Sequence, residues 1–219
     1  MHIKALTLGG IMLATSLAAH AADIPRTLFE VAGAQQHAAT LADGVLVIID
    51  AQREYRDGAL PLAGVDAAIT EIGKLLARAR QAGTPVIHVV HKGSGALFDP
   101  AQPGFEIVAP LRPNTDETVI EKSRVSAFFG TGLEEAIKRT GRHNLILVGF
   151  MTHNCLSSTA RQARDLGYPP TVVAAATATR DLPDGKGGVI AASALQAASL
   201  AALADRSASV VPRELDIAE

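Results

Sequence analysis

The sequence has few of the residues from which disulfides or aromatic cores are built. Its 219 residues include one cysteine and no tryptophan, and only 4% are aromatic. A single cysteine excludes an internal disulfide, so Cys155 must be buried, catalytic or bridged to another chain. With so few aromatic side chains, the core has to be built from Ala, Val, Leu and Ile, which suits helices packed closely on a parallel sheet.

An excess of charge of either sign is also absent. The formal net charge is −2, and no basic segment of the kind that binds nucleic acid is present.

The apolar stretch of residues 5–17 is too short for a membrane span, which needs about 20 residues. It precedes Ala19, His20 and Ala21, a small-x-small cleavage site. Residues 1–21 are therefore predicted to be a secretory signal peptide, and residues 22–219 a single periplasmic or secreted domain with no membrane contact after cleavage.

Buried strands and amphipathic helices alternate along the remaining chain. Apolar runs predict strands over residues 45–50, 86–91, 118–122, 145–149, 171–175 and 208–211. Helical spacing of apolar positions predicts helices over residues 65–82, 131–140, 156–166 and 189–204. This near alternation predicts an α/β fold, with a single-domain doubly wound sheet of six mainly parallel strands flanked by helices.

Three ionisable residues follow strands of this predicted sheet. Asp50 and Lys122 end two strands, and Cys155 comes one turn beyond a third, in the first turn of the following helix. Taken singly, Asp50 is either catalytic or a helix N-cap, Lys122 is catalytic or solvated, and Cys155 is a nucleophile or a small buried side chain. Because the carboxyl ends of parallel strands share one edge, the three together supply a base, a cation and a nucleophile.

The helix position of Cys155 carries an electrostatic expectation. Free N–H groups and the positive end of the helix dipole stabilise an anion there. The sequence therefore predicts that the pKa of the Cys155 thiol is lowered toward a reactive thiolate.

Other side chains are candidates for the surroundings of this edge. His88 and His91 lie three residues apart on a strand, so they point to opposite sides and cannot readily chelate one ion. Each is a core or strand-end histidine, although His91 could face the pocket. The long loop of residues 92–113, rich in Gly and Pro, is predicted to select the substrate. Phe128 and Phe129 either wall the pocket or anchor a turn in the core. The expected pocket residues are Tyr55, His91, Phe128, Phe129 and Thr152.

Three segments resemble one enzyme family. They are Val-Ile-Ile-Asp-Ala-Gln at residues 47–52, Val-Ile-Glu-Lys-Ser at residues 119–123 and Gly-Phe-Met-Thr-His-Asn-Cys at residues 149–155. In this order they resemble the isochorismatase-like cysteine hydrolases, which include nicotinamidases and N-carbamoylsarcosine amidohydrolases. The resemblance covers roughly residues 41–211 and extends to shorter matches at residues 159–161 and 178–181.

The resemblance implies a role for each of these residues. Asp50 would be the general base, Lys122 would support the thiolate and the orientation of Asp50, and Cys155 would be the nucleophile. The family also has a cis peptide in the nucleophile turn, which maps between Phe150 and Met151. The N–H groups of Met151 and Cys155 would then form an oxyanion hole.

Two departures from the family narrow the expected chemistry. Nicotinamidases share an Asp-x-His metal motif that the segment from His88 to His91 does not reproduce, so we expect no metal and no other cofactor. Members that hydrolyse the vinyl ether of isochorismate lack the nucleophilic cysteine. Cys155 therefore favours cleavage of a C–N bond in a small amide, ureido or lactam compound through an acyl-enzyme. A vinyl ether hydrolase and a catalytically silent binding protein remain the alternatives.

The family also implies an assembly. Its members commonly form dimers or tetramers, and the Ala-rich helix predicted over residues 189–204 offers a face of small side chains that could pack on a second copy. We therefore expect a homodimer or homotetramer.

Overall fold

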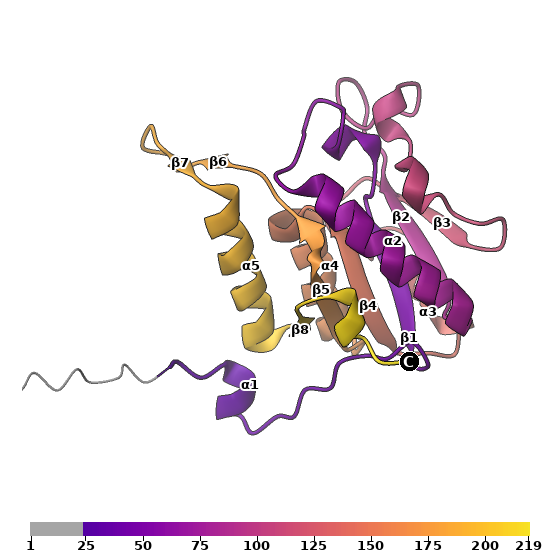
Figure 1. Ribbon diagram of the computed structural model, residues 1–219, viewed down its shortest axis with the longest axis vertical. Helices are drawn as coiled ribbons and strands as arrows, with labels where there is room; N and C mark the ends of the chain where they lie inside the picture. The colour runs from indigo at the N-terminus through magenta and orange to yellow at the C-terminus, as the bar shows by residue number, and fades with distance from the viewer. Residues whose placement is uncertain (1–23) are drawn as a thin grey trace, which may run out of the picture.

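A computed structural model describes residues 24–219, so the predicted signal peptide lies outside the described residues. Six strands form one sheet in the order β3-β2-β1-β4-β5-β8, and every neighbouring pair is parallel (Figure 1). The doubly wound α/β prediction is confirmed. The strands are β1 Gly44–Ile49, β2 Val86–His91, β3 Thr118–Lys122, β4 Asn144–Phe150, β5 Pro170–Ala178 and β8 Ser209–Val211.

Helices cover both faces of the sheet. The helices are α1 Leu28–Val31, α2 Val65–Ala82, α3 Leu133–Arg139, α4 Ser157–Asp165 and α5 Ala192–Arg206. Side chains alternate along β1, so Leu46 and Ile48 pack into the core beneath α2, whereas Val45, Val47 and Ile49 pack beneath α3 and α4. A strand buried on both faces has no polar alternation, which is why β1 and β4 are continuous apolar runs.

Two predicted helix boundaries differ from the structure. The helix predicted over residues 189–204 begins at Ala192, because Val189–Ile190 forms strand β7 of an antiparallel hairpin with β6 Leu182–Pro183. The helix predicted from residue 131 begins at Leu133, with Gly132 as its N-cap. The Thr131 hydroxyl lies before the helix, where it donates to the Ala127 carbonyl and accepts from the Leu133 N–H. Within residues 24–219, every helix is too short or too polar to span a lipid bilayer.

Gly149 allows β1 and β4 to approach closely beside the site. Its φ is 111°, and a Cβ at this position would lie 2.0 Å from the Ile49 carbonyl oxygen. Only glycine has both this backbone freedom and no side chain to collide. The ends of β1 and β4, which precede Asp50 and the turn that carries Cys155, are therefore held side by side.

Candidate active site

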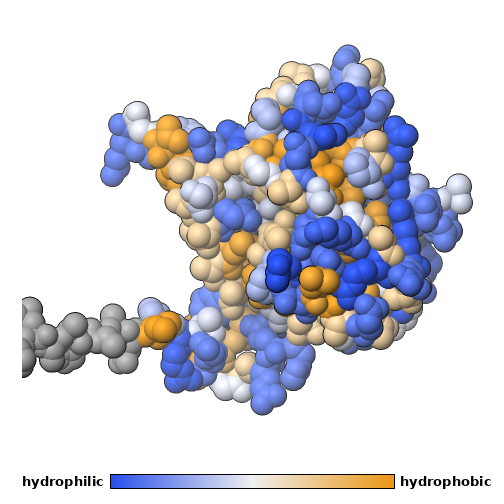
Figure 2. Space-filling view, viewed as in Figure 1, coloured by the Kyte–Doolittle hydropathy of each residue, from blue (hydrophilic) through white to orange (hydrophobic). Residues whose placement is uncertain are grey.

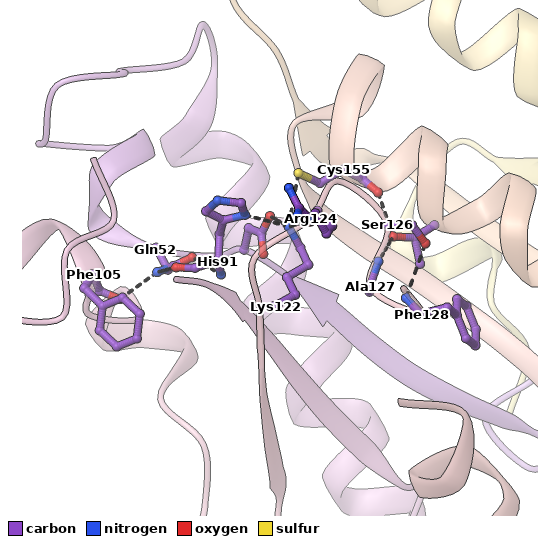
Figure 3. A network of polar contacts seen from close by, with 11 residues as sticks. Gln52, His91, Phe105, Lys122, Arg124, Ser126, Ala127, Phe128 and Cys155 are labelled. Carbon is purple, nitrogen blue, oxygen red and sulfur yellow. Dashed lines mark hydrogen bonds and ion pairs between the residues drawn. The ribbon is translucent and has the colours of Figure 1, made fainter. Parts of the chain in front are cut away.

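Asp50, Lys122 and Cys155 meet at the carboxyl edge of the sheet. The Lys122 Nζ lies 2.7 Å from Asp50 Oδ2, and it donates a hydrogen bond to Cys155 Sγ at 3.2 Å (Figure 3). All three residues are buried, and both partners of the ion pair have side chains with no exposed surface. The structure thus brings the three residues into one triad-like group.

Each member comes from a different strand end. Asp50 directly follows β1 with φ 49°, a left-handed conformation that Asp tolerates better than most residues. Lys122 is the last residue of β3, and Cys155 lies in the π-helix Thr152–Leu156 that joins β4 to α4. The peptide between Phe150 and Met151 is cis, as the resemblance implies.

The Lys122 ammonium is surrounded by more acceptor atoms than it has N–H donors. Besides Asp50 and Cys155 it lies 3.1 Å from His91 Nδ1 and 3.1 Å from the Arg124 carbonyl oxygen. An ammonium has three N–H donors for these four acceptors. Neither Asp50 oxygen makes a well-aligned hydrogen bond to a group within residues 24–219, so its contact with Lys122 is an ion pair by distance. The carboxylate keeps lone pairs available to accept a proton.

Burial is the largest influence on the pKa values of Asp50 and Cys155. It raises the pKa of Asp50 to about 6, although the Lys122 charge opposes the shift. Burial, with the Asp50 charge second, raises the pKa of the Cys155 thiol to about 12, and Lys122 offsets only part of this. The expected lowering of the thiol pKa is therefore wrong, because desolvation and a neighbouring carboxylate outweigh the lysine. At neutral pH the proton lies on sulfur and most of Asp50 is ionised.

His91 and His88 point to opposite sides of β2, as predicted. His91 faces Lys122, and burial together with the Lys122 charge lowers the pKa of His91 to about 4, so its imidazole is neutral. His88 Nε2 instead lies 2.9 Å from Glu117 Oε2. The two imidazoles therefore belong to separate clusters.

Gln52 fixes the position of His91. Its buried amide accepts a hydrogen bond from the His91 N–H at 2.8 Å and donates to the carbonyls of His91 and Phe105, at 3.0 and 2.9 Å (Figure 3). It thereby ties the end of β2 to the loop of residues 92–113. Gln52 was not predicted as a site residue; the signal in the sequence was its place two residues after Asp50.

Aromatic rings form one wall beside the triad-like group. Tyr55 is buried, and burial, followed by the Asp50 and Cys155 charges, raises the pKa of its hydroxyl. Phe98, which was not among the expected pocket residues, packs edge-on against both Tyr55 and His91, with ring centroids 5.1 and 5.0 Å apart. The long loop thus contributes a side chain to the site.

The remaining expected pocket residues have other positions. The Thr152 hydroxyl is buried and donates to the Ala178 carbonyl at 3.0 Å. Phe128 stacks on Tyr168 in the core beneath α3 and α4, which is the anchoring alternative, and Phe129 is 61% exposed. Thr159, within one of the short matching segments, accepts from the Ala127 N–H and donates to the Cys155 carbonyl, so it holds the Cys155 turn against the loop after β3.

A cleft lies on the Tyr55 side of the group. Residues 59–63, Arg180 and Asp181 line a space of about 440 Å³. The Leu62 N–H donates to the Tyr55 carbonyl oxygen at 3.0 Å, so this cleft adjoins Tyr55. The Arg180 Nε is buried and has no hydrogen-bond acceptor within residues 24–219. A guanidinium with an unused donor therefore lies beside this cleft.

One set of side chains could hold a metal ion. Asp50, His91 and Cys155 each present one ligand atom, and these atoms all lie within 4.8 Å of one another. The Lys122 ammonium lies among them, so a cation already occupies the position between the three atoms.

Comparison with known proteins agrees with this geometry. The Isochorismatase domain family model matches residues 44–214. The crystal structure of an isochorismatase from Pseudomonas putida KT2440 has 42% identity and a TM-score of 0.85, over 89% of this chain and 100% of that one. A secreted isochorismatase effector from Verticillium dahliae is 38% identical over 175 residues, which are 79% of this chain and 90% of that protein. A ureidoacrylate amidohydrolase from Pseudomonas savastanoi pv. phaseolicola is 29% identical over 169 residues, which cover 60% of this chain and 69% of that protein. The chain belongs to the isochorismatase-like hydrolase family.

Proposed function

We propose that the protein is a cysteine-dependent hydrolase that cleaves a C–N bond of a small amide, ureido or lactam compound through a covalent acyl-enzyme. The observation that carries the proposal is the contact of one ammonium with both the Cys155 sulfur and the Asp50 carboxylate, at 3.2 and 2.7 Å. A buried thiol, a base with a raised pKa and a fixed cation are the components of nucleophilic catalysis. Similarity to an amidohydrolase supports carbonyl chemistry.

The protonation states give the order of events. At neutral pH Asp50 accepts the thiol proton as sulfur attacks the carbonyl carbon, and the Lys122 ammonium stabilises the developing thiolate. The Met151 N–H donates no hydrogen bond within residues 24–219, so it can bind the oxyanion together with the Cys155 N–H. Asp50 then gives its proton to the leaving nitrogen. Water, deprotonated by Asp50, hydrolyses the thioester and restores the thiol.

Ammonia release from a panel of small primary amides and ureido compounds tests the proposal, with ring opening of lactams followed by mass spectrometry. We expect turnover of at least one class, and an acyl adduct on Cys155 in quenched samples. Cys155→Ala is the control and should give neither. Amide turnover that survives this substitution would overturn the covalent mechanism, while tight binding without any turnover would indicate a binding protein.

A vinyl ether hydrolase is the second candidate. Its support is the 38% identity to a protein named as a secreted isochorismatase effector, together with the pKa of Asp50 of about 6, which leaves part of the carboxyl protonated near neutral pH. A protonated Asp50 can donate to the vinyl carbon without help from sulfur. Pyruvate release from isochorismate that persists in Cys155→Ala would favour this activity over amide cleavage.

We further propose that the protein is a homodimer or homotetramer that uses α5. Only Ala192 and Leu203 of this helix are buried. Its exposed face carries small side chains without charge, at Ala194, Ala197, Ala198, Ala201 and Ala202. Figure 2 shows pale orange, weakly hydrophobic side chains over this region, on the left of the molecule. Light scattering at micromolar concentration should give a multimer, and Ala198→Arg should reduce it to a monomer; a monomeric wild type would contradict the proposal.

Export from the cytoplasm is proposed as well. It is supported by the N-terminal sequence, with its apolar stretch and small-x-small site, and by the similarity to a relative named as secreted. N-terminal sequencing of protein recovered from the periplasm or the medium should begin at Ala22. An uncleaved Met1 in soluble cell extract alone would argue against export.

A further inference from the structure

The surroundings of the Lys122 ammonium have the form of a metal site. Its nitrogen lies 2.7 Å from Asp50 Oδ2, 3.1 Å from His91 Nδ1, 3.2 Å from Cys155 Sγ and 3.1 Å from the Arg124 carbonyl oxygen (Figure 3). Four electron-pair donors around one cation is the number that a tetrahedral zinc ion uses. One sulfur, one imidazole nitrogen and oxygen ligands are also a set that zinc accepts.

We propose that Asp50, His91 and Cys155 form a latent site for a thiophilic divalent cation, Zn²⁺ or Cd²⁺, and that the Lys122 ammonium keeps this site closed. Zinc bonds to oxygen, nitrogen and sulfur measure about 2.0 to 2.3 Å, so each side-chain donor would move inward by about 1 Å or less. The three ligand atoms already lie within 4.8 Å of one another.

The supporting structure favours this arrangement. Gln52 bonds both the N–H and the carbonyl of His91, which fixes the backbone of one ligand. Thr159 donates to the Cys155 carbonyl at 2.7 Å, which fixes the backbone of another. Ligands that are held in place by such outer contacts bind metals more tightly than mobile ones. His91 is only partly buried, so the set is open to solvent on its side.

Metal binding and catalysis would exclude each other. On binding, the Cys155 thiol releases its proton to solvent and the sulfur bonds the metal as a thiolate, while His91 binds as the neutral imidazole. The sulfur lone pair and the Asp50 carboxylate are then no longer available for attack and proton transfer. In the wild type, repulsion between the ammonium and a divalent cation a few ångströms away opposes binding. Lys122 therefore decides whether the same three side chains serve a hydrolase or a metal site.

Titration of Lys122→Ala with Cd²⁺ tests the proposal without any substrate. We expect one Cd²⁺ per chain, a thiolate-to-metal charge-transfer band in the near ultraviolet, and an affinity at least ~100-fold above that of the wild type. Lys92→Ala is the matched control, since Lys92 directly follows β2 but is exposed and pairs with Glu121. It should bind Cd²⁺ no better than the wild type.

Two double variants assign the ligands. In the Lys122→Ala background, Cys155→Ala should remove the absorption band, and His91→Ala should weaken binding by roughly 10 to 100-fold. Equal affinities for the wild type and Lys122→Ala, or binding that persists without Cys155, would overturn the proposal.

Loss of Lys122 leaves Asp50 without its ion-pair partner, so Lys122→Ala could be unfolded in the absence of metal. Cd²⁺ should then restore its far-ultraviolet circular dichroism, because a metal that binds only the folded chain stabilises it. Lys122→Gln, which retains most of the side-chain volume, is the second variant. Failure of both variants to bind or refold with Cd²⁺ would also overturn the proposal. The result is independent of whether the protein cleaves amides.

Discussion

Two clusters of similar composition, one fully and one partly buried, lie at opposite ends of β3. The one at the amino end of β3 contains Arg80, Glu117 and His88. Glu117 receives two hydrogen bonds from the Arg80 guanidinium, at 2.8 and 2.9 Å, another from the Asn114 N–H at 2.9 Å, and lies 2.9 Å from His88 Nε2. These bonds, those from Arg80 foremost, lower the pKa of Glu117 to about 2.

The cluster at the carboxyl end of β3 again contains a cation, a carboxylate and a histidine of β2. Here Asp50 has an ion-pair partner but no well-aligned hydrogen bond within residues 24–219, and burial raises its pKa to about 6. The same three kinds of group therefore give opposite results. Saturated hydrogen bonding fixes a carboxylate in its charged form, whereas burial without such bonds leaves it able to take up a proton.

The largest expected contrast between the clusters concerns the nucleophile. Cys155→Ala should lower amide turnover by about 10⁴-fold or more, because no other group in the site can form the acyl-enzyme. Folding should persist, since only one sulfur atom is lost at the edge of the core. Steady-state kinetics with thermal unfolding of the same sample measures both. A variant that is inactive because it is unfolded would leave the nucleophile unassigned, so Cys155→Ser serves as the matched, nearly isosteric control.

Neutralising the carboxylate of one cluster should mainly lower turnover, and neutralising that of the other should mainly lower stability. Asp50→Asn removes the proton acceptor and should lower turnover by about 10² to 10⁴-fold. Glu117→Gln should leave turnover within a few-fold of the wild type but lower the free energy of unfolding by about 2 kcal/mol, since it weakens a buried, multiply bonded ion pair. Urea unfolding and initial rates compare the two variants. Similar losses of activity in both would refute the division into a reactive and a structural cluster.

Acid should affect the two clusters in different pH ranges. Because turnover needs ionised Asp50, kcat/KM should fall about tenfold per pH unit below pH 6. The pKa of Glu117 is lowered from 4.5 to about 2, so its contribution to the free energy of unfolding is complete above pH 4.5 and is lost as the pH falls toward 2. The pKa of Asp50 is raised from 3.8 to about 6, so folding favours its protonated form. Its contribution to the free energy of unfolding is therefore complete below pH 3.8 and is lost as the pH rises through 6. An acid limb that stays near pH 6 in Asp50→Asn would refute the assignment of Asp50.

The smallest effect concerns alkylation of the resting thiol. With the pKa of Cys155 raised to about 12, iodoacetamide should react slowly at pH 7 and faster up to at least pH 10, because only the thiolate reacts. Asp50→Asn should increase the rate about tenfold by removing a nearby negative charge, and Lys122→Ala should decrease it. Mass spectrometry is unambiguous here, since the chain has one cysteine. Rapid labelling at pH 7 that does not change with pH would show a thiolate in the resting protein.

The sheet and the triad-like group at its carboxyl edge could be predicted because they depend on local patterns. The apolar runs of β1 and β4 fix strands buried on both faces, and parallel topology brings their carboxyl ends together. Asp50, Lys122 and Cys155 were found in this way. The direction of the shift in the Cys155 pKa could not be predicted in this way. The position in the first helical turn indicates only the stabilising effect of the helix dipole, whereas burial and the distance to Asp50 are known only from the three-dimensional structure.

Residues fixed by irregular segments were harder to find. Phe98 reaches Tyr55 and His91 from a loop without periodicity, and Gln52 is recognisable as a clamp only when the loop at Phe105 is placed against β2. The start of α5 was missed because Val189 and Ile190 suit a helix and a strand equally, and only their pairing with β6 decides between them.

The burial of the Cys155 sulfur also bears on its survival under oxidising conditions. The residue is 4% exposed, and the high pKa keeps its sulfur in the thiol form. Exchange with a small disulfide such as oxidised glutathione requires a thiolate and an approach along the S–S axis, and both are restricted here. With no second cysteine in the chain, an intramolecular disulfide cannot form either. Burial and the raised pKa of Cys155 therefore both slow its reaction with small disulfides.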